Sequence, residues 1–421
     1  MSTTTKLKRV AQLLAGGTPS VDDASMWQEE FGIPWVTIGD MSGVGVVEHT
    51  DRSISQAGRS SKNLPLGEPG TVLFAMYASV GAVSQLGIPA TWNQALLGIT
   101  PDPDRADPRF LSYWLRHLGP TLPALARSNT QSNLNAEQVG GLPYPVLSVL
   151  SQRAIADFLD TETARIDALI TRKQALGELL LSRRQAATAS VVGDISDSEA
   201  RIATGLTWLP SVPASWRVAK LTQLARLGSG HTPSRQKPEY WVDCTIPWVT
   251  TGEVHQFRDD RIEFVTETRE KISELGLANS GAALHPAGTV VLSRTASAGY
   301  SAIMGSDMAT SQDFVTWTCG PDLDPRYLLL CLRAMRQDLL GRLAMGSTHK
   351  TIYVPDIEAI RIPLPPKERQ RSLVDQAWAA FSNIDRARDQ LEQQINLLRE
   401  HRQALITAAV TGQMDVPGVA A

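Results

Sequence analysis

The sequence lacks the features that would place the protein outside the cell or in a membrane. Its three cysteines, Cys244, Cys319 and Cys331, form no C-x-x-C pair, which argues against a disulfide framework and a structural zinc site. It contains no apolar run of about eighteen residues and no N-terminal signal pattern. We therefore expect a cytoplasmic protein that works in a reducing environment.

Motifs of common catalytic and metal sites are also missing. The sequence contains no G-x-x-x-x-G-K-[ST] loop, no H-E-x-x-H and no G-x-S-x-G, and its seven histidines are scattered. Residues 142–144 (Leu-Pro-Tyr) lack the polar residue and second proline that hold a flipped adenine, and neither Asp322 nor Asp356 has the partners of a nuclease core. We therefore expect a binding protein with no catalytic residue, no metal and no cofactor of its own. An enzyme with an unrecognised site would instead show activity from this chain alone.

Strong positive charge is the third absence. The net charge is −3 over 421 residues, so the chain as a whole does not attract a polyanion. Any surface that binds phosphate must be local or shared with a partner. The length allows two or three domains, each with its own core.

What the chain does contain is a duplication. Residues 33–37 (Ile-Pro-Trp-Val-Thr) recur at 246–250, an offset of 213, and residues 70–72 (Gly-Thr-Val) recur at 288–290, an offset of 218. Later matches keep the offset of 218: Gln152-Arg153 with Gln370-Arg371, Ile166-Asp167 with Ile384-Asp385, and residues 184–186 with 402–404. One small insertion explains the change of offset. A period this long indicates a duplicated module, and a duplicated module suggests a target with two halves.

Each module begins with a globular part of mixed α/β class. Short β-branched runs at residues 72–74, 290–292 and 245–251 predict strands entered from glycine turns. Helices are expected over 109–118 and 326–336, because each stretch follows an Asp-Pro that can start a helix.

A long helix without proline ends each module, over about 151–192 and 368–410. At 1.5 Å per residue each would span on the order of 60 Å, far longer than a typical helix. An apolar seam on such a helix needs a partner, so we favour antiparallel pairing of the two helices as a coiled coil over packing of each on its own domain. The residues predicted to form the seam are Ile166, Leu169, Leu176, Leu180, Ile384, Leu391, Leu398 and Leu405.

These patterns predict six segments. They are a first globular domain over 1–147, a central spacer helix over 148–193, a linker over 194–213, a second globular domain over 214–366, a C-terminal spacer helix over 367–412 and a tail over 413–421. The linker is expected to be exposed because residues 193–205 are polar and hold three acidic side chains.

Matched loops of the two modules carry polar side chains that could contact DNA. Hydroxyls, amides and cations position a phosphate backbone or read base edges. The framework repeats while these side chains differ, so the two modules would read different short sequences. The candidates in the first module are Thr18, Ser20, Tyr77, Ser79, Arg127, Asn129, Gln131 and Asn133. The candidates in the second module are Thr232, Ser234, Arg235, Lys237, Arg294, Ser297, Ser347, Thr348 and Lys350.

Each of these features also has a plain structural explanation. Gly-Thr-Pro-Ser is a common tight turn, and the polar run at 128–133 can be a solvated loop. Trp35 and Trp248 lie in apolar strands, which favours a place in the core over stacking on bases. Only the repetition at matched positions beside long helices favours the binding interpretation.

Several segments together are typical of one family. They are residues 362–366 (Ile-Pro-Leu-Pro-Pro) leading into Glu-Arg-Gln, the segments 152–160 and 399–412, and Gly-x-Thr-Pro-Ser followed by Tyr240-Trp241 and residues 246–249. With these motifs the chain resembles the specificity subunit of a type I restriction-modification enzyme, over nearly its whole length.

The resemblance implies two target-recognition domains joined by two long antiparallel helices, each domain reading one half of a bipartite double-stranded DNA site. It implies docking of two methyltransferase subunits and of restriction and translocase subunits. Those partners would bring S-adenosylmethionine, ATP and Mg, with methylation at adenine N6 of a flipped base, so this chain would be non-catalytic by itself. The alternative is a two-domain scaffold or adapter that binds no DNA.

The first module departs from the family pattern. Residues 146–150 replace the usual double proline, the Leu-Pro…Trp opening seen at 209–216 is missing, and Trp27 has no adjacent tyrosine. The second module therefore has the better candidate side chains, which are Arg235, Lys237, Arg294 and Lys350.

Overall fold

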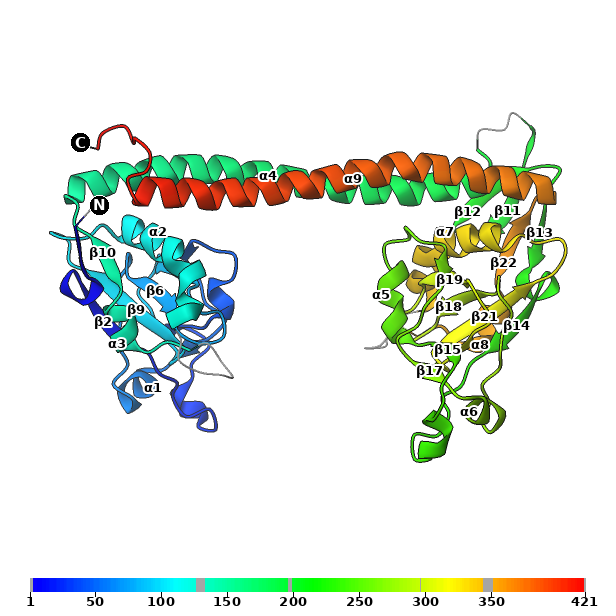
Figure 1. Cartoon of the computed structure of the whole chain (residues 1–421), viewed down its shortest axis with the longest axis horizontal. Coiled ribbons are helices and arrows are strands. Elements are labelled where there is room, and N and C mark those ends of the chain that lie inside the picture. Colours follow the sequence, from blue (N-terminus) through cyan, green and yellow to red (C-terminus); the bar gives the residue numbers. More distant parts are fainter. Residues whose placement is uncertain (1–2, 126–132, 196–198, 296, 344–350, 420–421) are drawn as a thin grey trace. The chain divides into compact units, whose positions relative to one another are not determined.

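The chain folds into two compact units. The computed structural model describes residues 3–125, 133–195, 199–295, 297–343 and 351–419. Unit 1 comprises Met1–Lys173 together with Gln393–Ala421, and unit 2 comprises Gln174–Glu392. Figure 1 shows the C-terminal segment, in red, lying with the N-terminal segments of unit 1. Both ends of the chain therefore belong to unit 1.

Unit 1 is built on a five-stranded sheet of order β2-β9-β6-β7-β4, with a second sheet of order β5-β3-β8 and a pair β1-β10. Its strands are β1 (Thr4–Lys6), β2 (Ala11–Ala15), β3 (Ile33–Val36), β4 (Val46–Val47), β5 (Ser53–Ile54), β6 (Val72–Ala75), β7 (Val83–Leu86), β8 (Thr91–Trp92), β9 (Leu96–Pro101) and β10 (Pro143–Pro145). Its helices are α1 (Gln56–Ser61), α2 (Pro108–Leu118), α3 (Ala136–Gly140), the first part of α4 (Val149–Val192) and the last part of α9 (Lys367–Val410).

Unit 2 repeats this plan, with sheets of order β14-β21-β18-β19-β16 and β17-β15-β20, the pair β13-β22 and an added hairpin β11-β12. Its strands are β11 (Arg201–Leu206), β12 (Leu209–Pro213), β13 (Arg217–Lys220), β14 (Ala225–Ser229), β15 (Ile246–Val249), β16 (Phe264–Val265), β17 (Lys271–Ile272), β18 (Val290–Ser293), β19 (Ser301–Met304), β20 (Ala309–Thr310), β21 (Phe314–Cys319) and β22 (Arg361–Leu364). Its helices are the last part of α4, α5 (Val254–Phe257), α6 (Glu274–Ala278), α7 (Pro325–Leu343), α8 (Val354–Glu358) and the first part of α9 (Lys367–Val410).

The repeated sequence motifs mark repeated geometry. The repeated Gly-Thr-Val begins β6 and β18, and the glycines before them, Gly70 and Gly288, have φ of 90° and 83°. Such a backbone conformation favours glycine, which explains why this residue recurs. The predicted strands at 72–74, 245–251 and 290–292 and the mixed α/β class are confirmed.

The helices after Asp-Pro are capped in the same way in both units. Asp107 Oδ1 accepts from the backbone N–H of Arg109 at 3.0 Å, at the start of α2. Asp324 Oδ1 accepts from the backbone N–H of Arg326 at 2.9 Å, at the start of α7. A side-chain oxygen at this position satisfies a donor that the first turn leaves unpaired. The predicted helices at 109–118 and 326–336 are confirmed.

A fully buried glutamine fastens each capped helix to a long helix. Gln152 Oε1 accepts from Asp107 N at 2.9 Å and from Tyr144 Oη at 2.6 Å, while its Nε2 donates to two backbone carbonyl oxygens. Gln370 Oε1 accepts from Asp324 N at 2.8 Å, and its Nε2 likewise donates to two carbonyl oxygens. The recurring Gln-Arg of the sequence therefore marks the junction between the sheet domain and the long helix.

The two long helices run antiparallel within each unit. In unit 1, Asp167 of α4 pairs with Arg402 of α9 at 2.9 Å, and Lys173 Nζ donates to Gln394 Oε1 at 2.6 Å. In unit 2, Arg184 of α4 pairs with Asp385 of α9 at 2.6 Å. As the residue number on α4 rises, the number of its partner on α9 falls, which shows that the two helices run antiparallel. The predicted antiparallel pairing of the long helices is therefore confirmed.

The predicted apolar seam is only partly right. Ile166 and Ile384 are buried, and Leu180, Leu391, Leu398 and Leu405 are half-buried. Leu169 and Leu176 are instead 39% and 45% exposed, contrary to expectation. The burial of α4 in unit 1 comes from the sheet domain, against which Ile155 and Leu159 pack. A pair of helices without a covering sheet leaves its seam open to water on both flanks.

The segments flanking the long helices also differ from expectation. The stretch predicted as a linker over 194–213 contains the hairpin β11-β12, and Asp194 is buried where it accepts two hydrogen bonds from Arg369 of α9, at 2.8 and 2.7 Å. In the predicted tail, Val416 is buried in the core of unit 1. Among the described helices, none combines the length and apolarity needed to cross a bilayer.

Candidate nucleic-acid interface

Two tryptophans hold the Thr-Pro-Ser loop of unit 1. Trp27 Nε1 donates to the carbonyl oxygen of Ser20 and Trp35 Nε1 donates to that of Gly17, both at 3.0 Å. The two rings meet edge to face with centroids 5.1 Å apart. Trp35 is buried, as its place in an apolar strand predicted. The loop over residues 16–20 therefore rests on a rigid aromatic base.

Unit 2 repeats this base with one contact fewer. Trp241 Nε1 donates to the carbonyl oxygen of Ser234 at 3.1 Å, and its ring lies 5.7 Å from that of Trp248. Trp248 is buried, but within the described residues its Nε1 has no hydrogen-bond partner. The loop over residues 230–234 is thus fixed to the aromatic pair by a single indole.

A guanidinium lies over each tryptophan pair, but it comes from different positions in the two units. In unit 1, Arg52 Cζ lies 3.6 Å from the ring centroid of Trp27, and Arg52 precedes strand β5. In unit 2, Arg235 Cζ lies 4.2 Å from the ring centroid of Trp241, and Arg235 directly follows the Thr-Pro-Ser loop. Sequence analysis missed Arg52 because the residue has no matching arginine in the second module.

Strand register shows that this is an exchange of positions. Trp35 N donates to the carbonyl oxygen of Arg52 at 3.0 Å, and Trp248 N donates to that of Glu270 at 3.2 Å, so Arg52 and Glu270 are equivalent. The position equivalent to Arg235 is occupied in unit 1 by Val21, the residue after Ser20. Each unit therefore carries one arginine on its aromatic pair, but at a different position. Where unit 1 has Arg52, unit 2 has Glu270, and where unit 2 has Arg235, unit 1 has Val21.

Because of this exchange, the two guanidinium groups differ in whether a nearby carboxylate compensates their charge. Arg235 Nη2 donates to Glu270 Oε2 at 2.6 Å, so its charge is compensated locally. Arg52 is exposed and has no carboxylate partner among the described residues. The uncompensated cation therefore lies in unit 1.

The hydroxyls of the Thr-Pro-Ser loops divide into two roles. Thr18 Oγ1 donates to Gln94 Oε1, and Thr232 Oγ1 donates to Gln312 Oε1 at 2.6 Å, so both threonines tie the loop to a neighbouring turn. Ser20 and Ser234 are exposed. Gln94 and Gln312 were not among the candidates, although their separation of 218 was a signal that could have identified them.

A second candidate loop joins the same turn. Met76 N donates to the carbonyl oxygen of Ala95 at 2.8 Å, next to Gln94, and the equivalent Arg294 N donates to that of Asp313 at 2.8 Å. Arg294 also donates through Nε to the carbonyl oxygen of Gln312 at 3.2 Å. The structure therefore brings the two loops of each unit together at one turn.

The remaining candidates differ in their freedom to contact a ligand. Tyr77 and Ser79 are exposed, whereas Asn133 and Ser297 are half-buried. Lys237 Nζ donates to Tyr240 Oη at 3.1 Å, and this hydrogen bond raises the pKa of the exposed lysine. The candidates Arg127, Asn129, Gln131, Ser347, Thr348 and Lys350 lie outside the described residues.

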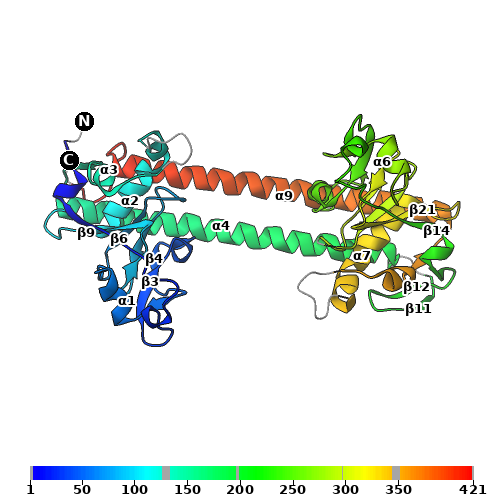
Figure 2. The ribbon, with the colours of Figure 1, turned by 90° about the horizontal axis from the view of Figure 1, so that it is seen from below.

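Within unit 1, Figure 1 shows the region of α1 at the end away from the long helices, and Figure 2 gives the view from below. The first candidate loop leads into this region, because Met26 accepts a hydrogen bond from the backbone N–H of Ser55, the N-cap of α1. Among the described residues no group of three or more potential ligands could hold a metal ion. The site offers hydroxyls, amides and guanidinium groups, the chemistry that contacts phosphates and base edges.

Comparison with known proteins agrees with these features. The model of the type I restriction modification DNA specificity domain matches residues 2–177 and 213–398. The chain is 24% identical over 168 residues to the type I restriction enzyme MjaIX specificity subunit of Methanocaldococcus jannaschii, a match that covers 40% of this chain and 38% of that protein. It is 19% identical over 355 residues to the EcoBI specificity subunit of Escherichia coli, covering 82% of this chain and 74% of that protein.

Solved structures show the same fold. One, from work on complex assembly and conformational transition of the type I R-M system, superposes with a TM-score of 0.66 at 16% identity and 98% coverage of both chains. The HsdS subunit from Thermoanaerobacter tengcongensis superposes with a TM-score of 0.50 at 16% identity, covering 98% of this chain and 97% of that one. The family model covers most of both repeats, so the chain belongs to the type I restriction-modification DNA specificity family and is a type I specificity subunit.

Proposed function

We propose that the chain recognises a bipartite double-stranded DNA target, with unit 1 contacting one half and unit 2 the other. The observation that carries the proposal is the exchange of the guanidinium between Arg52 and Arg235 on an otherwise repeated aromatic base. A framework that repeats while its exposed polar groups change suits two domains that read different sequences. An exchange of arginines on an exposed face would not improve the packing of a hydrophobic core.

Within this proposal the contacts divide by chemistry. Arg52 carries an uncompensated charge and would bind phosphate, which gives affinity without sequence information. Ser20, Tyr77 and Ser79 in unit 1, and Ser234 in unit 2, present exposed polar groups that could reach the DNA. Arg235 is held by Glu270, so it would act as a fixed donor with a defined direction rather than as a free cation.

The proposed role in a complex follows from the family. The chain would dock two methyltransferase subunits and restriction and translocase subunits, and would itself be non-catalytic. S-adenosylmethionine, ATP and Mg would be bound by those subunits. Because the chain has a net charge of −3, the partners would also supply part of the positive surface around the DNA.

Methylome sequencing tests this proposal directly. A host carrying this gene and its partner methyltransferase is compared with a strain that lacks only this gene. We expect one bipartite, asymmetric N6-methyladenine motif to disappear on deletion, which would define both half-sites. An unchanged methylome, with the partner subunits demonstrably expressed, would overturn DNA recognition and favour a scaffold that binds only proteins.

A further inference from the structure

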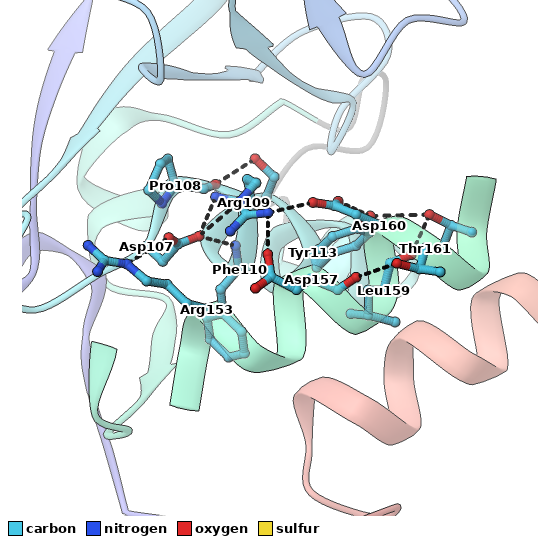
Figure 3. Close-up of polar contacts among 12 residues, drawn as sticks. Asp107, Pro108, Arg109, Phe110, Tyr113, Arg153, Asp157, Leu159, Asp160 and Thr161 are labelled. Atoms are coloured by element: carbon cyan, nitrogen blue, oxygen red, sulfur yellow. Dashed lines mark hydrogen bonds and ion pairs between the residues drawn. The ribbon is translucent and has the colours of Figure 1, made fainter. Parts of the chain in front are cut away.

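Unit 1 contains a charged cleft, and none of the DNA-binding candidates predicted from the sequence lies in it. It encloses about 790 Å³ between α2, the long helices and the segment that leads into β4. The charged and phenolic side chains on its walls are Arg109, Arg116, Arg402, Asp160, Asp167 and Tyr113. Figure 3 shows one wall, where Arg109 of α2 donates to Asp157 and Asp160 of α4 at 2.7 and 2.8 Å.

The cleft lies where unit 2 has five additional residues. Gln85 N donates to the carbonyl oxygen of Gly45 at 2.9 Å, and Ile303 N donates to that of Glu263 at 2.7 Å, so Gly45 and Glu263 are equivalent. The preceding Asp40 and Glu253 are equivalent as well, because each carboxylate accepts from the backbone of the threonine three residues before it. The change of offset from 213 to 218 therefore falls between these two points. In unit 2 the added residues form α5 and the loop after it.

That loop fills the equivalent space in unit 2 through Asp260. Arg336 donates two hydrogen bonds to the Asp260 carboxylate, of 2.8 and 2.6 Å, and Arg333 Nε lies 3.2 Å from the same carboxylate. Arg333 Nη1 and Arg184 Nη2 donate to the backbone carbonyl oxygen of Asp260 at 2.8 and 2.6 Å. Three arginines thus converge on one acidic residue.

Unit 1 retains two of these arginines but not the acid. Arg116 matches Arg333, since Arg116 donates to the carbonyl oxygen of Val83 at 3.1 Å and Arg333 to that of Ser301 at 3.5 Å. Arg402 matches Arg184 through its ion pair with the opposite long helix. Within the described residues Arg116 makes no other hydrogen bond. Burial lowers the pKa of this arginine, as expected for a guanidinium that lacks a full set of partners.

We propose that the cleft of unit 1 binds an acidic side chain of a protein partner, which takes the place that Asp260 occupies in unit 2. The inference rests on the proposed function, because the partner would be the methyltransferase subunit of the same complex.

The walls of the cleft favour a protein carboxylate over a DNA phosphate. Asp160 and Asp167 line the cleft beside its three arginines, so the lining carries one net positive charge, which matches a single carboxylate better than the several charges of a phosphate backbone. Val44 and Val46 at its edge are 40% and 46% exposed, and apolar residues of this kind match the stem and neighbours of a glutamate or aspartate. The arginines supply paired donors suited to a carboxylate.

Gly45→Glu tests the proposal by providing the acid from within the chain. A Cβ at Gly45 would meet only Arg116 Nη2 within 4 Å, at 3.9 Å, and glutamate is the residue found at the equivalent position, Glu263. Glu263 accepts from Arg326 Nε at 2.8 Å, and Arg326 is equivalent to Arg109, so the new carboxylate would have both Arg109 and Arg116 as partners and would exclude the acidic side chain of the partner subunit. Gly45→Gln is the matched control, with the same size and no charge, and Arg116→Gln removes the cation instead.

The measurement is a titration of the full-length chain with the purified methyltransferase subunit, followed by sedimentation or calorimetry. Loss of a buried charge pair predicts about 30-fold weaker assembly for Gly45→Glu and Arg116→Gln, and a smaller change for Gly45→Gln. Thermal melting verifies that each variant is folded. Equal assembly of Gly45→Glu and the unchanged protein would overturn the inference.

Binding of the bipartite duplex by the assembled complex is the second readout. We expect the assembled complex that contains the Gly45→Glu variant to bind DNA with the same affinity as the complex that contains the unchanged protein. If the variant assembles normally but binds DNA less tightly, the cleft takes a phosphate and the inference is wrong. If the unchanged protein assembles but binds no bipartite duplex, the proposed function fails while the docking inference stands. If the unchanged protein does not assemble with the subunit, both are wrong.

Discussion

Arg52 lies over the ring of Trp27, with its Cζ 3.6 Å from the ring centroid, and has no carboxylate partner among the described residues. Stacking on the ring restricts the arginine side chain without neutralising its charge, so the guanidinium is ordered and remains exposed at the surface. Its counterpart on the aromatic base of unit 2, Arg235, is already paired with Glu270. The two units therefore differ in how much of their affinity depends on charge.

The first prediction concerns Arg52→Ala. Loss of one phosphate contact should weaken binding of the assembled complex to DNA and lower the slope of log K against log salt by about 1. Fluorescence anisotropy at several salt concentrations measures both quantities. Arg52→Lys is the control, because it keeps the charge and should retain most of the slope. An unchanged slope for Arg52→Ala would show that this cation does not face DNA.

Glu270→Gln should have the opposite effect in unit 2. Removing the carboxylate frees the charge of Arg235, so affinity should rise and the salt slope should increase by about 1. Arg235→Ala alone should change the slope little, since its charge is already compensated. The double variant should lose the gain of Glu270→Gln. A gain that survives in the double variant would mean that Glu270 acts by repelling DNA and not through Arg235.

The buried glutamines should be costly to replace. Gln152→Ala leaves the backbone N–H of Asp107 and the hydroxyl of Tyr144 without their acceptor, and two carbonyl oxygens without their donor. Unsatisfied buried groups of this kind predict a loss of about 3 kcal/mol or more in the free energy of unfolding. Urea denaturation followed by tryptophan fluorescence measures the loss. Gln174→Ala, at an exposed position of the same helix, should change it by less than about 0.5 kcal/mol.

The two ion pairs between the long helices provide a matched comparison. Arg184 is buried, with 5% of its side chain exposed, while Asp167 is 51% exposed. Asp385→Asn strands a buried guanidinium charge and should cost about 3 kcal/mol, whereas Asp167→Asn should cost less than about 1 kcal/mol. Calorimetric unfolding of both variants tests the difference. Equal losses would mean that Arg184 is satisfied by the carbonyl oxygen of Asp260 without Asp385.

The duplication, the strands and the capped helices could be predicted because they depend on local sequence. Gly70 and Gly288 mark turns, and Asp107 and Asp324 mark helix starts, wherever the rest of the chain lies. The long helices were visible for the same reason. Leu169 and Leu176 were misplaced because a heptad pattern identifies a helix face but not what covers it.

The site could be predicted only in outline. The Thr-Pro-Ser loops were found by their repetition, but Arg52 was missed, because its partnership with Trp27 depends on strand register and not on a repeated residue. The compensation of Arg235 by Glu270 joins residues 35 positions apart in the sequence, so it was also invisible.

The composition of unit 1 has a consequence for synthesis on the ribosome. Its core includes Ile406, Ala409, Val410 and Val416, which are synthesised after the whole of unit 2, whereas unit 2 is one continuous stretch from Gln174 to Glu392. Domains commonly fold in the order in which they are made. Here the core of unit 1 is completed only after unit 2 has been made, so residues 1–173 lack part of their apolar contacts while unit 2 is being synthesised. The half that is made first is thus the half that most needs protection from aggregation before release.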